Sequence, residues 1–231
     1  MSSSRTLFVA LLVAGLASAG GALAGGLAGT VRDDAGKPVA DAVIYATPLA
    51  GLPAATVTRA VIDQVDKLYS PFVTAFRAGT TVTFPNKDNI KHHLYSVSPA
   101  KSFERPLYKG RKASPVFFDK PGEVTLGCNI HDWMIAHVLV LETPHAAVTD
   151  QAGRAVIAAL PAGDYEVRVW HPGMKGKKKA VRNPRKITVT AAAAEVAFEI
   201  RLRPKKRWWR KKPKDADKKY SGDEEIGRAH V

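Results

Sequence analysis

The stretch GCNIHDWMIAHVLVLETP, residues 127–144, joins a short polar loop to a long apolar run. The run MIAHVLVLETP is rich in Val, Ile and Leu, which predicts a long strand that ends at Pro144. The loop before it places Cys128, His131 and Met134 at a C-x2-H-x2-M spacing. This stretch therefore predicts a strand with a cluster of sulfur and nitrogen donors at its beginning.

The rest of the chain also has the pattern of short strands separated by turn residues. Turns are expected at residues 34–36 (Asp-Ala-Gly) and 120–122 (Lys-Pro-Gly). Between Val73 and Val97 the apolar residues form short β-branched and aromatic runs with no helical period. Residues 165–170 alternate between apolar and polar side chains, as in a half-buried strand. These patterns predict an all-β protein from Leu27 onward.

A second set of nitrogen donors lies upstream of the cysteine. The segment FPNKDNIKHHLYS, residues 84–96, places His92 and His93 at the start of a predicted strand. A thiolate, two imidazoles and a weak axial thioether form the ligand set of a blue-copper site. Adjacent strand residues point to opposite faces, so only one of the two histidines is expected to enter the site. Zinc is the rival ion, because it also binds Cys and His, but a thioether is a poor ligand for zinc.

These segments resemble the cupredoxin family, and the spacing in the Cys–His–Met loop is similar to that of amicyanins. The run from about Val61 to Pro144 is similar to bacterial plastocyanin-like proteins that are often labelled methylamine utilization proteins. The resemblance implies a Greek-key β-sandwich that holds one type-1 copper ion. It implies four copper ligands, which are His92, Cys128, His131 and Met134.

The resemblance also assigns roles to residues beside the ligands. In the family the first ligand histidine lies six residues after an asparagine, here Asn86, and this selects His92. Family members usually have an asparagine directly after that histidine, and its side chain ties the two ligand-bearing segments together. Here His93 takes that place. We expect it to form a replacement hydrogen bond toward the Asn129 region.

These residues and the resemblance predict a carrier of single electrons. Family members expose the imidazole that corresponds to His131 as the edge where electrons leave, and Trp133 lies in the same loop. The expected partner is a c-type cytochrome or a dehydrogenase. The sequence contains no nucleophile elbow and no Gly-rich phosphate loop, so we expect no enzymatic activity. Two alternatives stay open, a protein that binds or delivers copper without redox turnover and a scaffold with a vestigial site.

The N-terminus has the pattern of an export signal. Arg5 precedes an apolar run from Leu7 to about Ala19, and small residues follow it. We expect cleavage near Ala24 and a periplasmic location. Export argues against a nucleic-acid partner, although the formal net charge is +14.

The basic charge is concentrated near the C-terminus. The segment from Arg168 to Tyr220 holds 19 Lys and Arg against four acidic residues, and the remainder is close to neutral. Residues 203–231 have no periodicity and little apolar content, which predicts a disordered basic tail. Such a tail could bind an anionic membrane or an acidic protein weakly.

Two segments on either side of the expected copper domain resemble the carboxypeptidase regulatory-like, or transthyretin-like, β-sandwich. They are GTVRDDAGKPVADAVIYA near the N-terminus and TDQAGRAVIAALPAGDYEVRVWHP after Pro144. We expect the copper domain to be inserted between two parts of one such sandwich. The alternatives are two adjacent sandwiches and a single extended cupredoxin with extra strands. The expected divisions are 1–24 (signal peptide), 25–52 and 146–202 (the two parts of the sandwich), 53–145 (copper domain) and 203–231 (tail).

Overall fold

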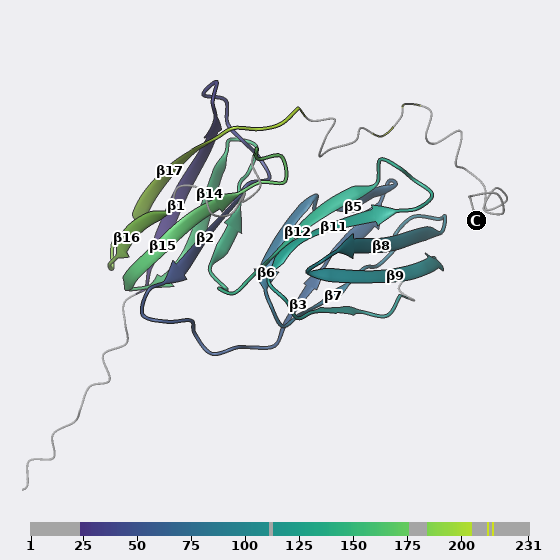
Figure 1. Cartoon of the computed structure of the whole chain (residues 1–231), viewed down its shortest axis with the longest axis horizontal. Helices are drawn as coiled ribbons and strands as arrows, with labels where there is room; N and C mark the ends of the chain where they lie inside the picture. Colours follow the sequence, from purple (N-terminus) through teal and green to yellow (C-terminus); the bar gives the residue numbers. More distant parts are fainter. Residues whose placement is uncertain (1–23, 111–112, 176–183, 205–211, 213, 215–231) are drawn as a thin grey trace, which may run out of the picture.

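The chain folds into two groups of strands that lie side by side (Figure 1). The computed structural model describes residues 24–110, 113–175, 184–204, 212 and 214. Every regular element within these residues is a β-strand, so the predicted all-β fold class is confirmed. Nearly all of the expected signal peptide and most of the expected tail lie outside the described residues. No helix in the described part of the chain is long and apolar enough to cross a membrane.

One group of strands forms a sandwich, which we call the flanking sandwich. Its sheets have the strand orders β14-β1-β17 and β13-β2-β15-β16. The strands are β1 (Ala24–Asp33), β2 (Val43–Pro48), β13 (Ala146–Val148), β14 (Arg154–Pro161), β15 (Gly163–Trp170), β16 (Arg185–Val189) and β17 (Ala194–Ile200). Leu27 and Val31 from one sheet pack with Val167 and Val169 from the other in a shared apolar core.

The flanking sandwich is built from two separate parts of the chain. Strand β1 pairs antiparallel with β14 and parallel with β17. Strand β2 pairs antiparallel with β13 and β15. The segment 58–141 therefore lies, in chain order, between strands that are hydrogen-bonded neighbours. The identity of this sandwich as a carboxypeptidase regulatory-like module stays a prediction.

The segment 58–141 forms the second group, which we call the central sandwich. A five-stranded sheet has the order β6-β12-β11-β8-β9, a three-stranded sheet has the order β10-β7-β3, and β4 and β5 form a hairpin. The strands are β3 (Thr58–Val61), β4 (Asp63–Val65), β5 (Leu68–Ser70), β6 (Val73–Arg77), β7 (Thr80–Thr83), β8 (His92–Ser98), β9 (Lys101–Tyr108), β10 (Val116–Phe118), β11 (Gly122–Cys128) and β12 (Ile135–Leu141). Val82 and Phe118 pack against Leu126 and Val138 in the core between the sheets.

The alternation of side chains along two neighbouring strands aims the predicted donors inward. On β11, Val124, Leu126 and Cys128 are buried and the residues between them are more exposed. On β8, His92 and Leu94 are buried, whereas His93 is only half-buried. Cys128 and His92 therefore continue the inward-facing rows of the central sandwich.

A third apolar cluster joins the two sandwiches. Tyr45 and Trp170 from the flanking sandwich pack with Val73, Leu139 and Leu141 from β6 and β12. Trp170 is 1% exposed. The cluster covers the face of the five-stranded sheet that points away from the central core, because the inward face of β12 carries Val138 and Val140. The two sandwiches therefore share a buried apolar interface.

Truncation of Trp170 should destabilise the protein strongly. We expect Trp170→Ala to lower the free energy of unfolding by about 3–5 kcal/mol, because it opens a cavity between the sandwiches. Urea denaturation, followed by circular dichroism, measures the change. Val156→Ala is the control, because Val156 is 65% exposed, and it should change the stability by less than about 0.5 kcal/mol. Equal effects of the two substitutions would contradict a packed interface.

Candidate metal centre

Three predicted donors meet at one point inside the central sandwich. The Nδ1 atoms of His92 and His131 are 3.1 Å apart. The Cys128 Sγ atom lies 3.5 Å from His131 Nδ1 and 4.0 Å from His92 Nδ1. All three side chains are buried, at 4% exposure or less. In the described part of the chain this is the cluster of His, Cys, Asp and Glu side chains that could hold a metal ion.

The spacing of these atoms fits a metal ion that is bound by all three. Bonds of about 2.0 Å to nitrogen and about 2.3 Å to sulfur, the lengths found for zinc, place the donors of a trigonal plane about 3.5 Å (N–N) and about 3.7 Å (N–S) apart. The observed separations of 3.1, 3.5 and 4.0 Å differ from these values by a few tenths of an ångström. The three donors are therefore close to a ligating arrangement in the chain itself.

The pairing of β8 with β11 explains how these donors come together. Leu94 pairs with Cys128, so the beginning of β8 lies beside the end of β11. The loop that follows Cys128 then turns back tightly, because the Met134 amide donates to the His131 carbonyl at 2.9 Å. The Cys128 amide also donates to the Met134 carbonyl, at 3.2 Å. This loop brings His131 to the cysteine and returns the chain to β12.

Met134 lies in the core cluster that contains Cys128, and its side chain is fully buried. Together with the three clustered donors, it makes the four residues expected from sequence consistent with a type-1 copper site.

Burial controls the protonation of the donors. Burial lowers the pKa of His131 to about 4, and the nearby charges of His92 and Lys67 act in the same direction. Burial also lowers the pKa of His92, although its hydrogen bond with Asp88 opposes the shift. Both imidazoles are therefore neutral near pH 7, which is the form that binds a metal ion.

The cysteine is a thiol with hydrogen-bond donors aimed at its sulfur. Burial raises the pKa of Cys128, and the backbone amides of His93, Ile130 and His131 oppose the increase by hydrogen-bonding to the sulfur. These amides would stabilise a thiolate, which is the form that ligates metals.

Asn86 organises the turn that leads to His92. Its side-chain amide donates to the carbonyls of Ile90 and Tyr108 at 2.8 and 2.9 Å, and its Oδ1 atom accepts the Asp88 amide at 2.9 Å. Asn86 is 4% exposed. These hydrogen bonds therefore fix the conformation of the segment between β7 and β8.

Asp88 was not predicted as a functional residue, although it lies four residues before His92. Its Oδ2 atom is 2.7 Å from His92 Nε2, on the side of the ring opposite Nδ1. Burial works against the charged carboxylate, but the hydrogen bonds from His92 and from the Lys67 and Asp66 amides hold the pKa of Asp88 below its usual value. The carboxylate therefore orients the His92 ring so that Nδ1 faces the other donors.

The expected bond between His93 and the Asn129 region is not formed in the described structure. His93 Nε2 instead lies 2.7 Å from Glu104 Oε1 on β9. The ring points away from the donors because His93 follows His92 on a strand. Only its backbone amide reaches the site, at the Cys128 sulfur. Asn129 is exposed.

The expected exposed edge of His131 is also corrected. His131 is 1% exposed and Trp133 is 6% exposed. The two rings are 5.2 Å apart, and the Trp133 indole donates to the Lys67 carbonyl at 3.1 Å. Lys67 is itself buried. The Trp133 ring therefore lies against His131, where the resemblance predicted open surface, and its indole is hydrogen-bonded to the β4–β5 hairpin.

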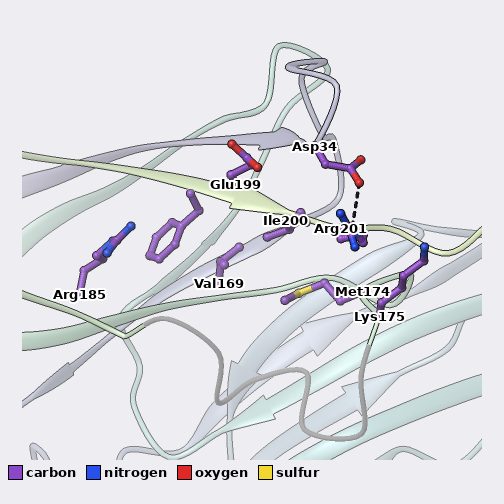
Figure 2. A pocket seen from close by; sticks show the side chains of 9 residues that line it. Asp34, Val169, Met174, Lys175, Arg185, Glu199, Ile200 and Arg201 are labelled. Carbon is purple, nitrogen blue, oxygen red and sulfur yellow. Dashed lines mark hydrogen bonds and ion pairs between the residues drawn. The ribbon is translucent and has the colours of Figure 1, made fainter.

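Figure 2 shows a separate cavity, in the flanking sandwich. Its wall combines the apolar side chains of Val169, Met174 and Ile200 with charged groups, among them an ion pair of Asp34 and Arg201 at 2.9 Å. None of the four predicted ligands lines it.

Part of the chain is similar to solved structures of copper proteins. No family model matches the chain, and no curated protein matches it. A purple cupredoxin from Nitrosopumilus maritimus is 26% identical over 36% of this chain and 99% of its own, with a TM-score of 0.32. A copper-containing nitrite reductase from Thermus scotoductus is 27% identical over 42% of this chain and 25% of its own, with a TM-score of 0.35. A mutant of amicyanin in its Cu(I) form is 22% identical over 42% of this chain and 99% of its own, with a TM-score of 0.34.

The contacts of Asn86 yield a test in the metal-free protein. Asn86→Ala leaves two buried carbonyls without their donor, at about 1–3 kcal/mol each, so stability should fall by about 2–6 kcal/mol. Asn129→Ala is the matched control, because this asparagine is exposed, and it should change stability by less than about 0.5 kcal/mol. Urea denaturation measures both. A neutral Asn86→Ala would show that the turn does not depend on this side chain.

Proposed function

We propose that this chain is a type-1 copper protein of the cupredoxin kind that carries single electrons. The observation that supports this most directly is the buried cluster of His92 Nδ1, His131 Nδ1 and Cys128 Sγ, whose separations fit one ion. Met134, buried in the same core, would supply a thioether to the ion. When bound, copper would supply a one-electron couple between Cu(II) and Cu(I).

The donor chemistry favours copper over zinc. Thiolate and thioether are soft ligands that suit Cu(I), whereas imidazole suits both oxidation states. Structural zinc sites are usually tetrahedral and draw on Cys, His and carboxylate ligands. Asp88, a carboxylate beside the site, binds the far side of the His92 ring. It therefore does not act as a fourth ligand at the point where the Nδ1 atoms meet.

The protein contributes a fixed and dry environment. The donors come from the end of one strand, the beginning of its neighbour and a short closed loop, so their separation is set by the fold. Apolar side chains such as Leu94 and Leu126 fill the core around them. A rigid arrangement that suits both oxidation states lowers the rearrangement needed for electron transfer. The four donors also leave no open position for a substrate, so we propose a carrier and not an enzyme.

The burial of the donors favours a carrier over a delivery protein. Delivery needs ligands that another molecule can reach and displace, whereas His92 and His131 are 0% and 1% exposed. For the carrier we propose a periplasmic location and a redox protein partner, a c-type cytochrome or a dehydrogenase. The sequence pattern at the N-terminus supports the location. Trp133, which contacts the His131 ring, is the group through which the electron would approach the surface.

The copper-loaded protein should show an intense thiolate-to-copper absorption in the visible range. Its Cu(II) spectrum in electron paramagnetic resonance should have a small parallel hyperfine splitting. We expect Cys128→Ser to abolish the absorption, because a hydroxyl cannot replace the soft thiolate. A colourless wild-type protein that binds Cu(II) with ordinary hyperfine splitting would contradict a type-1 site.

The role of Met134 can be separated from that of a buried methionine in general. Met134→Leu should raise the reduction potential by about 60 mV or more, a tenfold change for one electron, because loss of the axial donor disfavours Cu(II). Met174→Leu is the matched control, since Met174 is buried in the core of the flanking sandwich. Protein-film voltammetry measures both potentials. A shift of equal size in the control would exclude axial ligation by Met134.

A further inference from the structure

The tip of the β4–β5 hairpin, formed by Asp66 and Lys67, has a backbone conformation that the second of these residues, Lys67, does not favour. Their φ angles are +54° and +56°. Two-residue hairpin turns of this kind favour Asn-Gly or Asp-Gly, and a residue other than glycine in this region costs about 1–3 kcal/mol. Contacts outside the hairpin must therefore hold the tip in place.

One side of the tip is held by the carboxylate that orients His92. Asp88 Oδ1 accepts the Asp66 amide at 2.7 Å, and Asp88 Oδ2 accepts the Lys67 amide at 2.9 Å. The same Oδ2 atom is 2.7 Å from His92 Nε2. Asp88 therefore connects the tip of the hairpin to the predicted ligand His92 through hydrogen bonds.

The other side of the tip is held by the loop that carries the remaining ligands. The Trp133 indole donates to the Lys67 carbonyl at 3.1 Å. Trp133 lies between His131 and Met134 in sequence, and its ring contacts the His131 ring. The amide and the carbonyl of Lys67 therefore bond to two different ligand-bearing segments.

The body of the hairpin makes the same two connections. The backbone amide of Gln64 on β4 donates to the Pro85 carbonyl at 2.9 Å, and its carbonyl accepts the Lys87 amide at 2.8 Å, in the segment that leads to His92. Tyr69 on β5 donates its hydroxyl to the Gly127 carbonyl at 3.0 Å, directly before Cys128. Gln64 and Tyr69 are both buried.

We infer that the β4–β5 hairpin is a clamp that ties the His92 segment to the Cys128–Met134 loop and sets the distance between their donors. The clamp joins the two segments through Asp88 on one side and Trp133 on the other. The side chain of His93, which was expected to link these segments, contacts Glu104 instead. Its purpose, the positioning of metal ligands, rests on the proposed function. The clamp itself consists of hydrogen bonds within the chain.

Hydrogen exchange in the full, metal-free chain tests the clamp at both ends. Trp133→Phe removes the indole donor and keeps an aromatic ring beside His131. We expect it to speed exchange of the Asp66 and Lys67 amides, which bond to Asp88, by about tenfold, as for loss of one hydrogen bond. Asp88→Ala should in turn speed exchange of the Trp133 indole proton, at the opposite end. Coupled changes in both directions are the expected result.

Trp170→Phe is the matched control. It is the same substitution at a buried tryptophan of the interface cluster, and the Trp170 indole nitrogen has no hydrogen-bond partner in the described structure. It should alter exchange at Asp66 and Lys67 by less than twofold. The clamp is overturned if Trp133→Phe leaves those amides within twofold of wild type, or if Trp170→Phe affects them equally.

A second readout separates the clamp from the proposed function. In the Cu(II)-loaded protein, Trp133→Phe should change the parallel hyperfine splitting and the reduction potential, and Trp170→Phe should change neither. Coupled exchange without any change at the copper ion would overturn the positioning role. A wild-type chain that forms no type-1 site refutes the proposed function, whereas the exchange experiment still decides whether the hairpin joins the two segments.

Discussion

The interaction on which this structure depends is the meeting of two imidazoles and a thiol inside an apolar core. Buried polar groups in proteins are hydrogen-bonded, and here the three donors are partners of one another. In the chain the two Nδ1 atoms face each other at 3.1 Å, and Asp88 engages only the far nitrogen of His92. Burial also keeps both rings in the neutral form. A metal ion would bind all three donor atoms at once, so the hydrogen-bonded cluster that the fold buries is also prepared as a binding site.

The surrounding architecture limits how far these donors can move. Cys128 ends β11, which lies between β8 and β12 in the five-stranded sheet. One face of that sheet packs on the core of the central sandwich, and Trp170 and Tyr45 of the flanking sandwich cover β12 and β6 on the other. Because both faces of β12 are covered, every residue from 136 to 141 is buried. On β11, which pairs with β12, buried residues alternate with more exposed ones. The hairpin of β4 and β5 then links the segments on either side of the donors.

Part of this could be predicted from sequence, because it depends on local pattern. The C-x2-H-x2-M spacing indicated donors of the correct type, and the structure confirms that Cys128 and His131 meet a histidine. Asp88 was visible as a residue near His92, but nothing in its spacing showed that its carboxylate binds the ring. The contacts of Lys67 could not be predicted, because they use backbone atoms and join residues that are 21 and 66 positions apart. The exposure expected for His131 was wrong, because the fold buries this side chain and packs the Trp133 ring against it.

The sequence by itself determined the all-β class and the chemical nature of the donors, because strand alternation, turn residues and ligand type are properties of short segments. The tertiary structure decided which carboxylate orients His92 and which strands close the flanking sandwich, and it agrees with the resemblance that His92 is the histidine in the cluster. Strand β1 finds its partners in β14 and β17, more than a hundred residues away. Such pairings, and the direction in which each side chain points, depend on packing between distant segments and are settled only when the whole chain has folded.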